Sequence, residues 1–199
     1  MDAAAIRDRL STPWKHGEAA DLRGIRVTEA LDLSNLALCG VDFTGAVFEA
    51  GVTAKNARFD GLAWFKDVEF GAATDFSGAL FVNDARFDAA VFTAPADFSG
   101  AEFRGIAGFS QTQFRAGAAF GALNCYGNAD FADARADGAV TFAGSEFLGG
   151  LWASRTILPP DANLTDTQVH GRLWLRGARR GDGTLAAHDF GLSFGYTWT

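Results

Sequence analysis

The stretch ADFSGAEFRGIAGFSQTQF, residues 96–114, places Phe98, Phe103, Phe109 and Phe114 five, six and five residues apart. An amphipathic helix repeats its apolar residues at intervals of three and four, and a half-buried strand at intervals of two. Neither element explains the observed spacing. The stretch therefore indicates a repeated architecture whose unit has five or six residues.

The same spacing extends in both directions, as roughly 29 units between Ala20 and Gly177. Units of five and six residues alternate without a break from Ala46 to Asp161, which gives a period of eleven residues. A chain that turns the same way after every short strand winds into a solenoid, in which stacked coils bury one continuous core. The period therefore predicts an all-β solenoid.

Each unit has the same internal pattern. The third residue is apolar in every unit, from Leu22 to Trp174, and the first is small or aliphatic in all units but the last, which begins at Arg172. In an extended chain these two residues point to one side and the second and fourth to the other. The fifth residue, often Gly, Asp or Asn, suits a turn. Seventeen of the nineteen Phe residues hold the third position, where we expect them to stack in the core: Phe43, Phe48, Phe59, Phe65, Phe70, Phe76, Phe81, Phe87, Phe92, Phe98, Phe103, Phe109, Phe114, Phe120, Phe131, Phe142 and Phe147.

The units ADFSG (96–100) and AEFRG (101–105) resemble the repeat of the pentapeptide-repeat family, which reads small, polar, Leu or Phe, polar, Gly-like. The resemblance implies a right-handed quadrilateral β-helix with four units per coil, hence about seven coils between residues 20 and 177. The sixth residue of alternate units departs from the family pattern and should fall on two opposite corners. A left-handed hexapeptide helix is the alternative fold, but it needs a steady period of six.

Three segments follow from this reading. Residues 1–19 form an N-terminal helical cap, with a helix over Asp2–Leu10, because the open end of a solenoid exposes apolar core. Residues 20–177 form the β-helix. Residues 178–199 leave the repeat and form a C-terminal cap or dimerisation segment.

Composition narrows the function. A net charge of −7 argues against direct nucleic-acid binding, which needs a basic surface. The three His residues are isolated, so we expect no metal site, and no catalytic motif or cofactor fingerprint occurs, so we expect neither an enzyme nor a cofactor. We see no signal peptide and no apolar run of membrane-spanning length, which leads us to expect a cytoplasmic protein away from membranes. Two free thiols are expected, an outward Cys39 and an inward Cys125.

Function should therefore depend on the outer walls. Units four apart share a wall, and one wall collects a candidate acidic row of Asp32, Asp75 and Asp97. We expect a protein–protein binding module with an unidentified protein partner. The resemblance allows a more specific alternative, because some pentapeptide-repeat proteins mimic duplex DNA, bind DNA gyrase and protect it from inhibitors.

The C-terminal stretch DFGLSFGYTWT alternates strictly between apolar and small or polar residues, which predicts a strand with one strongly apolar face. Such a face needs cover, either as a cap folded back on the last coil or as the contact of a homodimer. The resemblance favours the dimer, since gyrase-binding members of the family dimerise through their C-termini. The candidate contact residues are Phe190, Leu192, Phe194, Tyr196 and Trp198.

Overall fold

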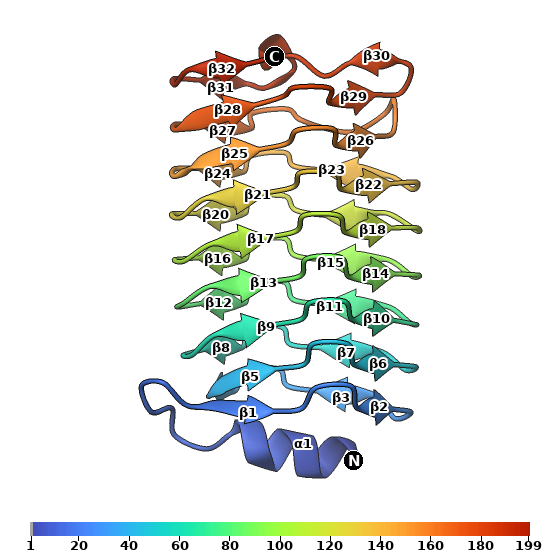
Figure 1. Ribbon diagram of the computed structural model, residues 1–199, viewed down its shortest axis with the longest axis vertical. Coiled ribbons are helices and arrows are strands. Elements are labelled where there is room, and N and C mark those ends of the chain that lie inside the picture. The colour runs from blue at the N-terminus through green and yellow to red at the C-terminus, as the bar shows by residue number, and fades with distance from the viewer. Residues whose placement is uncertain (1) are drawn as a thin grey trace.

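The computed structural model describes residues 2–199, which form a right-handed, four-walled β-helix of about eight turns (Figure 1). Strands on each wall pair in parallel with those of the next coil, mostly with a register of 22 residues, as between Phe70 and Phe92. The expected seven coils become about eight turns because the chain after residue 177 continues along three of the walls.

Two walls have nine strands each. Wall A is made of β1 (Ala19–Asp21), β5 (Gly40–Asp42), β9 (Ala63–Trp64), β13 (Ala85–Arg86), β17 (Ala107–Gly108), β21 (Ala129–Asp130), β25 (Gly150–Trp152), β28 (Arg172–Trp174) and β32 (Thr197–Trp198). Wall B is made of β2 (Arg26–Val27), β6 (Val47–Phe48), β10 (Glu69–Phe70), β14 (Val91–Phe92), β18 (Gln113–Phe114), β22 (Arg135–Ala136), β26 (Ile157–Leu158), β29 (Arg179–Arg180) and the antiparallel β30 (Gly183–Thr184).

The other two walls are shorter. Wall C is made of β3 (Leu31–Asp32), β7 (Val52–Thr53), β11 (Thr74–Asp75), β15 (Ala96–Asp97), β19 (Ala118–Ala119) and β23 (Val140–Thr141), and it ends in a single bridge from Thr141 to Asn163. Wall D is made of β4 (Ala37–Leu38), β8 (Arg58–Phe59), β12 (Leu80–Phe81), β16 (Glu102–Phe103), β20 (Asn124–Cys125), β24 (Glu146–Phe147), β27 (Gln168–Val169) and β31 (Leu192–Ser193).

Two kinds of corner explain the alternation of five and six residues. The five-residue units lie on walls A and C, and their fifth residue has a positive φ, as at Gly45 (70°) and Ala89 (57°). The next residue then donates its N–H back to the third, as from Ala46 N to Phe43 O at 2.8 Å, which closes a tight turn of the type that needs a left-handed residue at its third position. The six-residue units lie on walls B and D, so the extra residues fall at the B–C and D–A corners.

The interior is a stack of phenylalanine rings. All seventeen third-position Phe side chains are buried. Rings on one wall lie nearly parallel in successive coils, as in Phe65 and Phe87 (centroids 4.8 Å apart, 2° between planes), and rings on the opposite walls A and C meet edge to face, as in Phe87 and Phe98 (5.2 Å, 82°). Offset-stacked and edge-to-face pairs are the favourable aromatic geometries, so the rings add specific contacts to the burial of apolar area.

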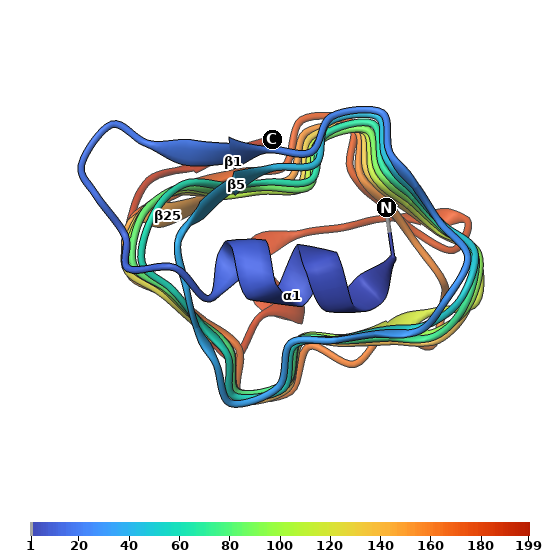
Figure 2. The same cartoon turned by 90° about the horizontal axis from the view of Figure 1, so that it is seen from below.

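The N-terminal end of the core is closed by a helix. Helix α1 (Ala3–Leu10) lies across the end of the rod (Figure 2), with Ile6 and Leu10 fully buried against the first coil. It begins after Asp2, whose side chain accepts a hydrogen bond from the backbone N–H of Ala5 at 2.8 Å. Arg7 fixes the helix on wall C by donating to the backbone carbonyl of Asp32 at 2.7 Å.

The C-terminal segment differs from the single long strand expected over residues 190–198. It is divided between β31 on wall D and β32 on wall A, each paired in parallel with the coil before it. The end of the core is covered instead by the segment that crosses from wall B to wall D, which includes the 3-10 helix η1 (Ala187–Asp189) and buries Leu185 and Phe190. Of the five residues of the expected apolar face, only Phe190 takes part in this cap.

The repeat predicts a core position for Trp174, as the third residue of its unit, and this prediction is wrong. Leu173 and Leu175 are buried, and Trp174 lies between them on the outer side, in register with Trp152 and Trp198. The indoles of Trp174 and Trp198 stack with centroids 5.0 Å apart. The last unit of the repeat therefore begins at Leu173, and Arg172 is the sixth residue of the unit before it.

Both cysteines are free thiols and both are buried. Cys125 faces the core between Phe103 and Phe147, and burial raises the pKa of its thiol to about 12. Cys39 lies at an outward position, but the end of α1 covers it, and its Sγ lies 3.8 Å from the carbonyl of Arg9.

We expect Cys125 to stay unmodified by a water-soluble thiol reagent at pH 8 in the native protein, because only the thiolate reacts and this site disfavours it. Labelling followed by mass spectrometry of tryptic peptides measures this directly, with the protein in guanidinium chloride as the positive control. Native labelling of Cys125 as fast as in the denatured protein would contradict its placement in the core.

Candidate protein-binding surface on wall C

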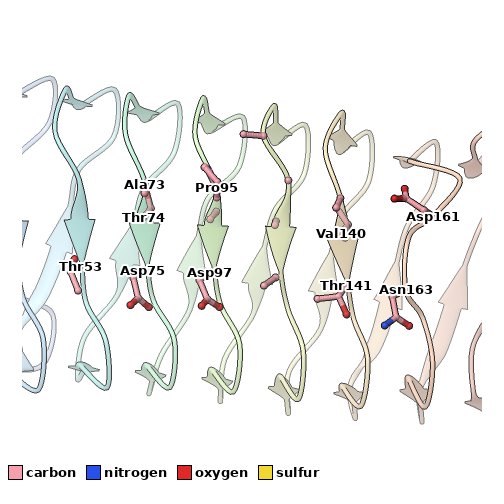
Figure 3. Close-up of a pocket in the computed structure, with 16 residues that line it drawn as sticks. Thr53, Ala73, Thr74, Asp75, Pro95, Asp97, Val140, Thr141, Asp161 and Asn163 are labelled. Carbon is pink, nitrogen blue, oxygen red and sulfur yellow. The ribbon is translucent and has the colours of Figure 1, made fainter.

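The candidate acidic row lies along wall C, where strand pairing aligns the outward second positions of successive coils. Asp32 pairs with Thr53, Thr53 with Asp75, and Asp75 with Asp97. The row continues through Ala119 to Thr141 and Asn163. Figure 3 shows Asp75 and Asp97 side by side in this row, between Thr53 and Thr141. Asp32 lies near α1, apart from the other two.

Each aspartate of the row also has a structural role. Oδ1 of Asp75 accepts a hydrogen bond from the backbone N–H of Ser77 at 2.8 Å, and Asp97 does the same with Ser99. Asp32 makes the equivalent bond to Ser34, and the bonds from Ser34 hold the pKa of the Asp32 carboxyl below its usual value. This is the side-chain turn typical of Asp and Asn. The sequence signal for it is the spacing Asp-x-Ser in LDLSN, TDFSG and ADFSG, which predicts this turn in addition to the outward position of each aspartate.

On wall C, none of the three aspartates of the acidic row forms an ion pair within residues 2–199. Several acids of the other walls do pair with an arginine: Asp60 with Arg58 on wall D at 2.6 Å, Asp137 with Arg135 beyond wall B at 2.6 Å, and Asp88 with Arg86 on wall A at 3.6 Å. Within residues 2–199, the second carboxylate oxygens of Asp75 and Asp97 have neither a hydrogen-bond nor an ion-pair partner. These two oxygens therefore remain available to another molecule.

The same wall is hollowed into a shallow trough of about 670 Å³ (Figure 3). It runs across several coils, and its floor is shallowest in side chains at Ala119, which stands where the neighbouring coils carry Asp97 and Thr141. At Gly117 an added Cβ would lie 2.4 Å from the carbonyl oxygen of Ala139, so this edge of the trough cannot carry a side chain. The trough is lined by Thr53, Ala73, Thr74, Asp75, Pro95, Ala96, Asp97, Ala116, Gly117, Ala118, Ala119, Ala139, Val140, Thr141, Asp161 and Asn163.

The C-terminal aromatic residues form a second exposed surface, on the last coil of walls A and D. Leu192, Phe194, Tyr196 and Trp198 are exposed by 43%, 61%, 81% and 52%, whereas Phe190 is buried. Phe194 stacks on His170 with centroids 4.9 Å apart. The structure thus brings four of the five candidate contact residues to the surface at one end of the rod.

No group of three or more His, Cys, Asp or Glu residues within residues 2–199 is arranged to hold a metal ion. Over the same range, no helix has the length and apolar character needed to cross a bilayer. The three buried side-chain atoms without a partner, His170 Nε2, Trp174 Nε1 and Arg180 Nε, lie in the last coils and do not form a cluster with a nucleophile.

A comparison with known protein families identifies the same repeats. A family model described as pentapeptide repeats (9 copies) matches residues 40–80 and 87–135. Residues 40–80 and 87–135 of this chain are pentapeptide repeats. The matched residues include Asp75 and Asp97 and most of the stacked phenylalanines.

Among solved structures, the chain is similar to QnrB1, a plasmid-mediated fluoroquinolone resistance protein. The two are 21% identical, the match covers 90% of each chain, and the TM-score is 0.32. At these values the likeness adds nothing to an argument about function. No curated protein matches the chain.

Proposed function

We propose that this pentapeptide-repeat protein is a non-catalytic rod that binds a partner protein through its outer walls, with wall C as the contact surface. The observation that carries the proposal is the pairing of a trough with unneutralised charge: the free oxygens of Asp75 and Asp97 lie along a hollow floored by alanines. Electrostatic complementarity across such a surface sets partner choice and association rate. The two free thiols agree with a reducing compartment such as the cytoplasm.

The test removes the charge and keeps the fold. Asn163 already makes the same turn bond on wall C, to Thr165 N at 3.0 Å, so Asp75→Asn with Asp97→Asn should fold normally. In quantitative affinity purification, we expect the double variant to recover about tenfold less of a cytosolic partner than the wild type does. Glu69→Gln with Glu146→Gln removes two charges from walls B and D as the matched control. Equal recovery with both double variants would rule out wall C.

A DNA-mimicking protein that binds DNA gyrase is the second candidate, and the acidic row together with the net charge of −7 favours it. Against it, the acids of the other walls are largely paired with arginines. A gyrase supercoiling assay with added protein separates the two candidates. A gyrase-binding protein should inhibit supercoiling and should lose this effect in Asp75→Asn with Asp97→Asn. If the protein has no effect on supercoiling at any concentration, the general protein-binding function remains and the gyrase candidate is ruled out.

We also propose that the rod forms a homodimer through its C-terminal aromatic end. Exposed aromatic residues of this size at the open edges of two sheets favour self-association. We expect light scattering to give twice the chain mass of 21.1 kDa for the wild type and 21.1 kDa for Phe194→Ser with Tyr196→Ser. Tyr126→Ser, at a residue exposed by 53% in the middle of wall D, is the control. A monomeric wild type would contradict the dimer.

A further inference from the structure

Two aspartates on wall A show how this fold holds a guanidinium group. Asp21 and Asp42 lie opposite each other in successive coils. Their Oδ1 atoms accept hydrogen bonds from the backbone N–H groups of Arg23 and Thr44, at 3.2 and 2.9 Å. The guanidinium of Arg23 lies against the other two oxygens: its Nη2 is 2.8 Å from Asp21 Oδ2, and its Nε is 3.8 Å from Asp42 Oδ2. One arginine therefore pairs with the aspartates of two coils.

Wall C has the same pair of aspartates without the arginine. Asp75 and Asp97 lie opposite each other in successive coils, and their Oδ1 atoms accept hydrogen bonds from the N–H groups of Ser77 and Ser99, both at 2.8 Å. Ser77 stands two residues after the first aspartate, the place that the arginine takes on wall A. Figure 3 shows the two carboxylates side by side with the same orientation. With serine in the arginine's place, their second oxygens have no partner within residues 2–199.

The trough leaves room for an arginine to reach this pair from outside. Asp75 and Asp97 are half-buried, and both line the trough of about 670 Å³. The next residue of the row is Ala119, which pairs with Asp97 and is followed by Thr141. An arginine side chain buries its methylene stem along apolar surface and keeps its charged end among polar groups. A stem lying over Ala119 would bring the guanidinium to the two aspartates, because each coil adds only about 4.8 Å.

We propose that the Asp75–Asp97 pair binds an arginine side chain of the partner protein. The guanidinium group has five N–H donors in a planar fork, so it can meet two carboxylates at once, whereas the ammonium group of lysine is a compact charge. Arg23 shows this geometry on the same scaffold. The inference rests on the proposed function, because it names the chemical group that a partner places on wall C.

The experiment titrates the full, nitrogen-15-labelled chain with Nα-acetyl-arginine amide and follows the backbone N–H resonances of Ser77 and Ser99 by NMR. These two groups donate to the carboxylates of the pair, so their resonances report on its occupancy. Nα-acetyl-lysine amide has the same charge, and Nα-acetyl-citrulline amide has the same shape without the charge. We expect saturable shifts with arginine, a dissociation constant about fivefold higher with lysine, and no saturable shift with citrulline. Equal affinities for arginine and lysine, or no saturable shift with arginine, would overturn the proposal.

Protein variants then test the position, with the response followed at the Ser99 resonance. Asp75→Asn with Asp97→Asn should abolish the response to arginine, because the pair loses its charge. Ser77→Arg keeps both aspartates but should abolish the response as well, because its own guanidinium would occupy the pair as on wall A. Thr165→Arg adds the same charge at the corresponding position of the coil at the end of wall C, and it should leave the response unchanged. An undiminished response in Ser77→Arg, or an equal loss in Thr165→Arg, would contradict an arginine site at this pair.

The two proposals can fail separately, since the titration needs no partner protein. If arginine binds as expected but Asp75→Asn with Asp97→Asn recovers the cytosolic partner as well as the wild type does, the wall C function fails and the arginine site stands. If that double variant loses the partner but Ser77→Arg does not, the arginine site is overturned and the wall C function stands.

Discussion

Phe98→Asp should unfold the middle of the rod. The Phe98 ring is fully buried and stacks between Phe76 and Phe120, with centroids 5.2 and 5.3 Å away. Truncating such a side chain costs about 3–5 kcal/mol, and an unpaired carboxylate in the same place adds a desolvation penalty. Because total stabilities are about 5–15 kcal/mol, the variant should lose its cooperative thermal transition or melt far below the wild type by circular dichroism.

The neighbouring residue provides the control. Asp97→Asn keeps the side-chain turn at Ser99 and faces outward, so its free energy of unfolding should differ from the wild type by less than about 0.5 kcal/mol. Asp97→Ala loses that turn bond and should cost about 0.5–1.5 kcal/mol, which is more than an ordinary surface change. Equal damage from Phe98→Asp and Asp97→Asn would refute the inward and outward assignment.

Truncating the N-terminal cap should have the second-largest effect. Ile6 and Leu10 are fully buried between α1 and the first coil, so each change to Ala should cost about 2–5 kcal/mol. In addition, a loosened helix would expose the first coil's unpaired strands and core. We expect the double variant to melt earlier and to aggregate on heating, as measured by circular dichroism and light scattering.

Asp8→Ala, on the exposed face of the same helix, is the control and should stay within about 0.5 kcal/mol of the wild type. A double variant that melts with the wild type would mean that α1 does not stabilise the end of the rod. The two predictions together separate the contribution of the stacked interior from that of its cover.

The sequence was sufficient for the repeat and its walls between Ala46 and Asp161, because an unbroken period of eleven assigns each residue there to a wall and a side. The alignment of Asp32 with Asp75 and Asp97 follows from that period, and strand pairing confirms it. The unit containing Trp174 could not be resolved in the same way. Arg172, Leu173 and Trp174 allow two phases of the unit, and only the pairing of Leu151 with Leu173 decides between them.

The C-terminal bend was also missed, although a signal for it exists. Gly127, Gly149 and Gly171 recur every 22 residues at the D–A corner, where coils approach too closely for a side chain. Gly195 continues this series after 24 residues, and its added Cβ would lie 1.9 Å from the carbonyl oxygen of Gly171. The alternation of residues 190–198 concealed that corner. The early end of wall C could not be predicted, since it depends on where η1 crosses the rod.

The 22-residue register also makes the length of this protein a modular property. Ala63, Ala85 and Ala107 occupy equivalent places in successive coils, so removing residues 85–106 would join Asp84 to Ala107 and leave both capped ends intact. Each coil contacts only its neighbours, and each adds about 4.8 Å to the rod. Insertion or deletion of whole coils could therefore change the distance between a site on wall C and the C-terminal end without altering either of them.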